Sequence, residues 1–365
     1  MGKKLRVGII GTGGIAQVHM KAYQTFDDVE IVGGADIVPG KSREFLDKYN
    51  LTNAKAFDSA AELIKNVEMD AVSVCTYNTT HAENVIMALE AGLHVQCEKP
   101  MSFTLQESVD MVKASRKANR MLTIGFQPRY DRNRKRVDDI INSGALGKIY
   151  YIQSGGGRRR GIPGGTFVDV DKAGFGCLGD IGCYSIDECL HAVKYPKPIS
   201  VSATASNYFG TNPKYFDAVV PFKVDDFSVA LVRMENDLTF MFRQSWAMHA
   251  DTLGDTLWLG TEGAIKIKSE FDYANKPSRI MYFTDVNGQN VDSFVLPSYP
   301  FNAYDGPEEK DIFRAKIRDF CDAVIQGRPA PIPGEEIIYN QAICDGIYRS
   351  SKLNREVEIV IPSLD

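Results

Sequence analysis

Lys99, Asp180 and Tyr184 are the side chains of this sequence best suited to acid–base chemistry on an alcohol. Lys99 lies in the run Cys97-Glu98-Lys99-Pro100, directly after a predicted strand, and Pro100 favours an extended backbone at the lysine. A lysine at such a strand end could reach a cofactor ribose and a substrate hydroxyl, and its cation would stabilise a developing alkoxide. Asp180 and Tyr184 follow a glycine-rich stretch that we expect to open a helix.

Each of these residues also has a plainer interpretation. Lys99 could be a surface lysine in an ion pair with Glu98. A polar stripe at spacings of four, three and four residues runs along one face of the predicted helix and could simply be solvated. Its members are Asp180, Tyr184, Asp187 and His191. We expect His191, about two turns beyond Tyr184, to be structural rather than catalytic.

A glycine-rich turn close to the first residue predicts a dinucleotide site. An apolar strand at 5–10 runs into Gly-x-Gly-x-x-Ala, and a helix-compatible segment follows. Gly11 permits the tight turn, Gly13 lets the backbone approach a pyrophosphate, and Ala16 lets the helix pack on the strand. The N–H groups at the helix start would then face the phosphates. The residues we expect at the phosphates are Gly11, Thr12, Gly13, Gly14, Ile15 and Ala16.

Asp36 predicts NAD rather than NADP as the cofactor. It ends a second predicted strand, about 20 residues after the glycines, where a carboxylate binds a ribose 2′-hydroxyl and repels a 2′-phosphate. Arg43 is the nearest positive charge beyond Lys41 and could weaken this preference for NAD. The alternative is that Asp36 only caps a turn before Pro39.

Alternating strand and helix patterns predict a doubly wound parallel sheet in residues 1–124. The expected strands there are 5–10, 29–36, 70–76, 93–97 and 121–125, with helices at 15–25, 40–49, 58–66, 80–91 and 104–118. Residues 125–365 predict a second α/β domain with a large, mostly antiparallel sheet and a final helix pair. Its expected strands are 148–157, 199–209, 224–234, 237–247, 255–260, 263–268 and 279–284, and its helices 308–326 and 335–351.

The amino-acid composition limits the classes of partner that we expect the protein to bind. The formal net charge of −5 and the pI near 5.7 argue against a nucleic-acid partner. We see no signal-like or membrane-length apolar run, which predicts a cytoplasmic protein without membrane contact. The seven cysteines are an odd number without CxxC pairs, so we expect reduced thiols. Cys177, Cys183 and Cys189 have one histidine nearby, which makes a metal site improbable.

Several motifs together resemble the glucose–fructose oxidoreductase, inositol dehydrogenase and rhizopine-catabolism (Gfo/Idh/MocA) family over nearly the whole length. They are Gly11–Ala16, Asp36, Cys75-Thr76-Tyr77-Asn78 with His81, Glu98-Lys99-Pro100, Gly125-Phe126-Gln127-Pro128-Arg129-Tyr130, Asp180-x-Gly-x-Tyr184-x-x-Asp187, Ser245-Trp246-Ala247 and Gly260-Thr261-Glu262-Gly263. The resemblance implies an N-terminal Rossmann domain, a C-terminal domain whose open sheet often serves oligomer contacts, and NAD(P)-dependent oxidation or reduction of sugars, inositols and related cyclic alcohols. Further cofactor contacts are expected at Thr76, Asn78, His81, Glu98, Lys99 and Gln127.

The resemblance also assigns roles at the reacting centre. Lys99 and Asp180 match the family's motif lysine and aspartate. Tyr184 stands where most members have a histidine, and some relatives, including glucose–fructose oxidoreductase itself, resemble this chain in having a tyrosine there. An ordinary phenol has a pKa of about 10, so Lys99 would have to lower it for base work near neutrality. The expected substrate contacts are Lys99, Arg129, Arg158, Arg160, Asp180 and Tyr184.

The run 156–166, with its three consecutive arginines, is similar to a subgroup that acts on glycosides, including enzymes forming 3-keto sugars. It would form a loop over the pocket, with Arg158 or Arg160 donating to sugar hydroxyls; the alternative is a solvent-facing basic loop. We therefore expect a homo-oligomeric, NAD-dependent dehydrogenase of a sugar, glycoside or polyol. Two alternatives remain at this point. One is a glycosidase that retains NAD and works by transient oxidation, and the other is a non-catalytic dinucleotide sensor.

Overall fold

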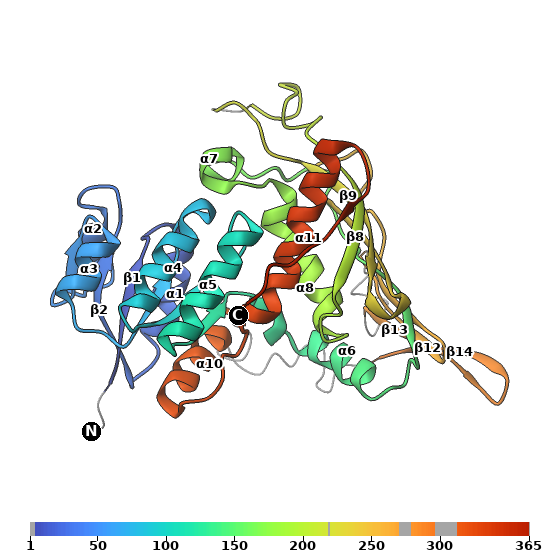
Figure 1. The fold of residues 1–365 in the computed structure, drawn as a ribbon, viewed down its shortest axis with the longest axis horizontal. Helices are drawn as coiled ribbons and strands as arrows, with labels where there is room; N and C mark the ends of the chain where they lie inside the picture. The colour runs from blue at the N-terminus through green and yellow to red at the C-terminus, as the bar shows by residue number, and fades with distance from the viewer. Residues whose placement is uncertain (1–3, 218–219, 270–278, 296–311, 365) are drawn as a thin grey trace. The chain divides into compact units, whose positions relative to one another are not determined.

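The computed structural model describes residues 4–217, 220–269, 279–295 and 312–364 (Figure 1). The chain forms two compact units. The first contains Met1–Gln127, Glu308–Ile338 and Pro362–Asp365, and the second contains Pro128–Pro307 and Tyr339–Ile361.

A six-stranded parallel sheet forms the centre of the first unit and confirms the predicted Rossmann architecture. Its strands in spatial order are β3 (Lys55–Phe57), β2 (Val29–Ala35), β1 (Leu5–Ile10), β4 (Ala71–Val74), β5 (His94–Cys97) and β6 (Leu122–Ile124). Five of them lie where the sequence pattern indicated. The edge strand β3 was not predicted, because three residues carry too little periodicity to be recognised.

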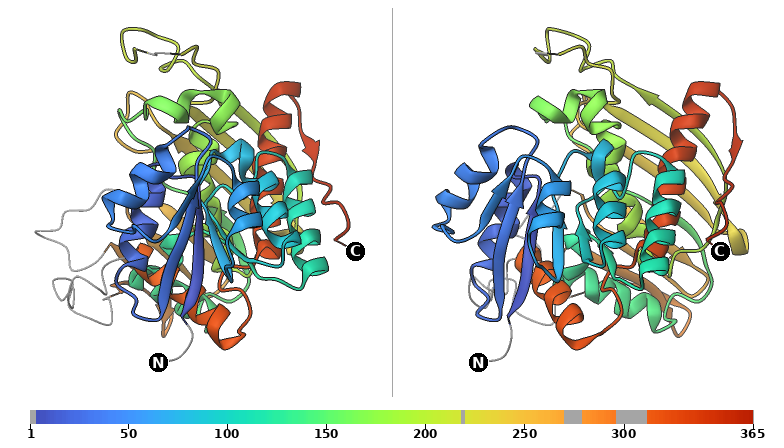
Figure 2. Two further views of the ribbon diagram at one scale, coloured as in Figure 1. Left: turned by 90° about the vertical axis from the view of Figure 1, so that its left-hand side faces the viewer. Right: turned by 60° about the vertical axis from the view of Figure 1, so that its left-hand side comes forward.

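Helices cover both faces of this sheet (Figure 2). They are α1 (Gly14–Tyr23), α2 (Lys41–Lys48), α3 (Ala60–Asn66), α4 (His81–Glu90), α5 (Leu105–Ala118) and α10 (Ile312–Gln326). One core joins α1, α2 and α10 to the strands through side chains such as Met20, Leu46, Phe320, Val7 and Ile9. Our prediction kept 125–365 together, whereas α10 packs in the first unit, because its apolar stripe fits the sheet face beside α1.

The second unit contains a nine-stranded sheet that confirms the predicted, mostly antiparallel architecture. Its strands in spatial order are β14 (Gln289–Phe294), β13 (Ile280–Val286), β12 (Gly263–Ile267), β11 (Thr256–Gly260), β7 (Ile149–Gln153), β10 (Thr239–Ser245), β9 (Phe227–Met234), β8 (Pro198–Ser206) and β15 (Val357–Glu358). Strands β7 and β10 pair in parallel, and the other neighbouring pairs in the described part of the chain are antiparallel.

Helices cover one face of this second sheet, and no helix of the unit packs on the other face in the part of the chain that the structure describes. The helices of the unit include α6 (Arg132–Asn142), α7 (Val170–Ala173), the π-helical turn η4 (Leu178–Gly182), α8 (Cys183–His191) and most of α11 (Gly334–Leu353). Trp258 of β11 donates to the carbonyl of Cys189 at 3.1 Å, and Gly346 of α11 lies so close to Val201 that a Cβ would approach within 2.8 Å. No helix in the described ranges has the length and apolar character needed to cross a membrane.

Candidate active site

The glycine turn after β1 has the geometry of a phosphate cradle. Gly11 has a φ of +83°, and a Cβ there would lie 2.7 Å from the carbonyl oxygen of Cys75, so both backbone and space require glycine. A Cβ on Gly13 or Gly14 would meet nothing within 4 Å, and no side chain caps the start of α1. Ala16 is fully buried against the strands. The helix start therefore offers N–H groups and room, which fits a dinucleotide pyrophosphate.

Asp36 at the end of β2 is held as an ionised carboxylate. Its Oδ2 accepts hydrogen bonds from the backbone and hydroxyl of Thr12 at 2.9 and 2.8 Å and lies 3.0 Å from Lys41 Nζ. Burial alone would raise the pKa of Asp36, but these hydrogen bonds outweigh it and hold the pKa below its ordinary value. Its Oδ1 also accepts from Val38 N, so the turn-capping alternative describes a real contact. Arg43 is engaged by two backbone carbonyls and by Asp47.

The other residues predicted at the cofactor also follow carboxyl ends of strands, where open parallel sheets bind ligands. They are Thr76, Asn78 and His81 after β4, Glu98 and Lys99 after β5, and Gln127 after β6. His81 is buried and its Nδ1 donates to the carbonyl of Pro100 at 2.8 Å, which ties α4 to the Lys99 segment. Direct cofactor contact of these residues stays a prediction.

Glu98 lies at the centre of a buried polar network that the sequence did not indicate. Its Oε1 accepts from His19 Nε2 at 2.7 Å and from Lys316 Nζ at 2.5 Å. The other ring nitrogen of His19 lies 3.1 Å from Ser73 Oγ, which contacts the hydroxyl of Tyr23 at 2.8 Å. We call these five residues the Glu98 network. The lysine that pairs with Glu98 Oε1 is thus Lys316 from α10, and the network fixes the backbone one residue before Lys99.

Two opposing effects set the charge of the network. Burial alone would raise the pKa of Glu98, but the Lys316 cation and the His19 hydrogen bond lower it far below its ordinary value. Burial lowers the pKa of His19, as does the Lys316 charge, so the ring is neutral at pH 7. The network therefore holds one buried ion pair and a neutral histidine.

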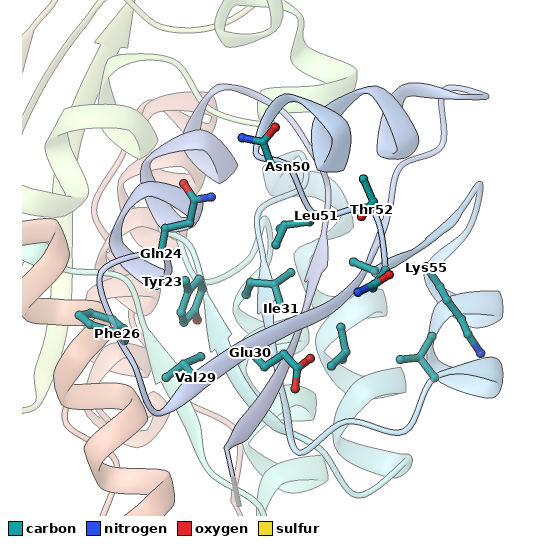
Figure 3. Close-up of a pocket in the computed structure, with 14 residues that line it drawn as sticks. Tyr23, Gln24, Phe26, Val29, Glu30, Ile31, Asn50, Leu51, Thr52 and Lys55 are labelled. Carbon is teal, nitrogen blue, oxygen red and sulfur yellow. The ribbon is translucent and has the colours of Figure 1, made fainter. Parts of the chain in front are cut away.

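A cavity of about 450 Å³ in the first unit lies at the amino end of β2 and not at the carboxyl ends of the strands (Figure 3). Its lining includes Val29, Glu30 and Ile31, at the amino end of β2, together with Tyr23 and Asn50. Because ligands of doubly wound sheets bind at the carboxyl ends, we do not assign the dinucleotide to this cavity.

Asp180 lies in the π-helical turn η4, and its carboxylate is oriented by Trp246. The indole Nε1 donates to Asp180 Oδ2 at 3.0 Å. Buried Asp225 fastens the start of this segment, because its carboxylate accepts from Gly176 N and Leu178 N, both at 2.8 Å. Gly176 packs so tightly that a Cβ would lie 1.8 Å from the Asp225 carbonyl oxygen.

The predicted polar stripe is corrected by this geometry. A π-turn holds more residues than an α-turn, so Asp187 and His191 are rotated about the helix axis relative to Asp180 from where an uninterrupted α-helix would place them. Asp187 is buried and accepts from Arg129 Nε at 3.1 Å and Nη2 at 2.8 Å, with Tyr195 beside it. His191 lies 3.2 Å from a carboxylate oxygen of Asp138 on α6, which agrees with a structural role.

The three arginines expected to bind substrate all make contacts within the protein. Two guanidinium nitrogens of Arg129 hold Asp187, so substrate contact by Arg129 stays a prediction. Arg160 is anchored, because its Nη1 donates to the carbonyl of Met248 at 2.6 Å. Arg158 is exposed and donates to the carbonyl of Gly161 at 3.4 Å.

Lys99 belongs to the first unit, whereas Asp180 and Tyr184 belong to the second. Their convergence beside a nicotinamide stays a prediction. Sequence reasoning missed His19, Lys316 and Asp225. The available signal was a polar residue within an apolar helix face: His19 lies beside Ala16 and Met20, and Lys316 beside Ile317 and Phe320.

Comparison with known proteins gives consistent findings. Residues 5–126 match a family model described as the Gfo/Idh/MocA oxidoreductase family, NAD-binding Rossmann fold, and residues 135–266 match the C-terminal domain of the same family. The chain is 29% identical to D-glucoside 3-dehydrogenase of Escherichia coli K12 over 97% of each chain. It is 34% identical to myo-inositol 2-dehydrogenase of Thermotoga maritima over 41% of this chain and 44% of that protein.

Two solved structures share the fold. Levoglucosan dehydrogenase in complex with NADH has a TM-score of 0.80 at 22% identity and covers 98% of this chain and 100% of that one. Aldose–aldose oxidoreductase from Caulobacter crescentus, in complex with glycerol, has a TM-score of 0.75 at 22% identity with the same coverage.

Proposed function

Because the chain belongs to the Gfo/Idh/MocA family of NAD-binding oxidoreductases, we propose that it transfers hydride between NAD and a secondary alcohol of a sugar, glycoside or cyclic polyol, at C3 of a pyranose. The observation that carries this proposal is the end-to-end similarity to D-glucoside 3-dehydrogenase. The anchored Asp180 beside Trp246 supports it, since an oriented carboxylate suits recognition of a polyhydroxylated ring.

The cofactor is NAD rather than NADP in this proposal. The support is Asp36, whose lowered pKa keeps a negative charge at the end of β2, where a ribose 2′-phosphate would be repelled. Lys41 already pairs with that carboxylate. Kinetics with NAD and NADP at one substrate concentration test this choice, and equal kcat/KM for the two would contradict it.

In this proposal each residue of the site has a separate role. The glycine turn at Gly11 and Gly13 holds the pyrophosphate, and the nicotinamide supplies the hydride chemistry when bound. Tyr184 takes the proton from the reacting hydroxyl, and the Lys99 cation favours the phenolate form that this step requires. Asp180 orients Lys99 or accepts a hydrogen bond from a second hydroxyl. The protein thus contributes positioning and electrostatics.

A panel of monosaccharides, inositols and glycosides, scored by NADH absorbance, tests the activity. Mass spectrometry of the products then locates the new carbonyl. We expect net NADH formation with a glucoside. Release of free sugar without net NADH would instead indicate a glycosidase that retains NAD, and would overturn the dehydrogenase assignment.

We further propose that the protein is a cytoplasmic homo-oligomer that associates through the open face of the second sheet. Half-buried Leu231 and Met241 lie opposite each other on β9 and β10, half-buried Leu257 lies on β11 beyond the intervening strand β7, and a second copy would cover all three. The seven buried cysteines support a reducing compartment. Light scattering tests the assembly: Leu231→Lys should shift the mass toward a monomer, and an unchanged mass would contradict this interface.

A further inference from the structure

We propose that Arg160, Phe209, Tyr215 and His249 form a docking platform for the second ring of a glycoside substrate, whether aglycone or further sugar. The inference rests on the proposed function and specifies its substrate class. We call these four residues the aromatic platform.

The three rings of the aromatic platform pack against one another. The ring centroids of Phe209 and Tyr215 are 4.9 Å apart, and that of His249 lies 5.1 and 5.6 Å from them. The Tyr215 hydroxyl is 3.5 Å from His249 Nε2. Phe209 and Tyr215 are half-buried and His249 is exposed, so a mutually supported ring cluster lies at the surface of the unit.

Arg160 is fixed on this cluster rather than solvated freely. Its guanidinium lies 5.0 Å from the centroid of Phe209 and 4.8 Å from that of Tyr215, within cation–π range. Its Nη1 donates to the carbonyl of Met248. Among the described residues, no hydrogen-bond acceptor engages its Nε or Nη2. An exposed arginine held in this way presents oriented donors at little further cost in side-chain entropy.

The base of the platform is rigid. Phe209 N and Gly210 N donate to the buried carboxylate of Asp226 at 2.8 and 2.6 Å. Phe216, next to Tyr215 in the chain, packs edge-on against Phe222 at 5.6 Å between centroids. A site supported by buried contacts can hold a ligand in one orientation.

The platform is connected to the reacting centre through one short segment. Phe222 and Trp246 share a buried cluster, and Trp246 orients Asp180. His249 follows Trp246 by three residues, so their Cα atoms lie at most about 11 Å apart. Trp246, which orients Asp180, and His249, which belongs to the platform, thus lie in one short segment, so a glycoside whose first ring contacts Asp180 would extend its second ring toward the platform.

The chemistry of the platform suits a sugar or aryl ring. Aromatic faces attract the polarised C–H bonds of a pyranose face or stack with an aryl group, and guanidinium donors bind ring hydroxyls. A monosaccharide has no second ring to make these contacts. The platform should therefore raise the specificity for two-ring glycosides over methyl glucoside.

The test compares kcat/KM for phenyl β-glucoside and cellobiose with that for methyl β-glucoside. We expect the ratio to fall about tenfold in Phe209→Leu and in Arg160→Met, which corresponds to about 1.4 kcal/mol. Tyr150→Ala is the matched control. Tyr150 is a 46% exposed aromatic at the start of β7, which pairs in parallel with β10 and so lies at the opposite end from Trp246.

Each outcome decides a separate point. Oxidation of glycosides with an unchanged ratio in both variants overturns the platform and leaves the proposed function standing. A wild-type protein that oxidises no sugar overturns the proposed function, and calorimetric titration of phenyl β-glucoside into the NADH-loaded protein then decides the platform by whether the variants lose binding. A changed mass in light scattering with an unchanged ratio would assign the rings to a subunit contact instead. Melting curves establish that each variant is folded.

Discussion

Replacing Lys316 by methionine should destabilise the first unit strongly, because it leaves Glu98 buried without its cation. Methionine retains most of the aliphatic stem, so the change removes charge more than volume. Lys316 and Glu98 are 2% and 3% exposed, and their charged atoms are 2.5 Å apart. Breaking a buried pair of this kind typically costs about 3–5 kcal/mol, a large part of the roughly 5–15 kcal/mol that stabilises a domain.

The free energy of unfolding should depend on pH differently in the wild type and in Lys316→Met. In the wild type the pKa of Glu98 lies below its unfolded value, so its stabilising contribution is present above about pH 4.3 and is lost in acid. In Lys316→Met, burial without the cation should raise that pKa above the unfolded value. The variant should then gain stability relative to the wild type as pH falls from 8 toward 5, because Glu98 takes up a proton on folding.

Urea unfolding followed by circular dichroism at pH 5.5 and pH 8 measures both effects. Arg116→Met is the control, since Arg116 pairs with Glu335 at 3.3 Å on an exposed surface of the same unit and should change the unfolding free energy by less than about 1 kcal/mol. The double variant with Glu98→Gln should recover part of the loss. A loss no larger than that of the control, or a pH slope equal to that of the wild type, would refute the reasoning.

Three further outcomes are expected. Lys99→Ala should lower kcat more than it weakens NADH binding measured by fluorescence titration, and comparable activity would remove Lys99 from the mechanism. Tyr184→Phe should lower kcat by about 100-fold or more and change the pH–rate profile, which an unchanged profile would contradict. Burial raises the pKa of Asp226 to about 6, so protonation of this carboxyl stabilises the folded state. This contribution to the free energy of unfolding is fully present below about pH 4 and is lost as pH rises through 6. The melting temperature of Asp226→Asn relative to wild type should therefore rise between pH 5 and pH 8, and a constant difference would refute this.

The parts of the fold set by local patterns could be predicted from the sequence. Strand β1, the glycine turn and α1 follow one another within a few residues, so their chemistry is readable from composition and spacing. Helix α6 was missed because its sequence is strongly polar and only Val137 and Ile141 are buried. Strands β14 and β15 lie at the two edges of the sheet, where partial exposure weakens the alternation.

The parts of the site that depend on distant residues could not be predicted. Lys316 and Glu98 are 218 residues apart, and nothing local to Glu98 indicates which cation will neutralise it. The start of the π-turn that carries Asp180 is hydrogen-bonded by Asp225, again from another segment. A helical-wheel argument assumes an uninterrupted α-helix, so it misplaced Asp187 relative to Asp180.

Asp225 and Asp226 are adjacent residues just before β9, and their carboxylates accept hydrogen bonds from two different loops. The first holds the segment that carries Asp180, and the second holds Phe209 and Gly210. A library that diversifies this dipeptide would disturb turnover and ligand preference together. Diversifying 211–215 while keeping both aspartates should change which glycosides the protein accepts. The position of Asp180 should stay unchanged, because Asp225 still holds its segment.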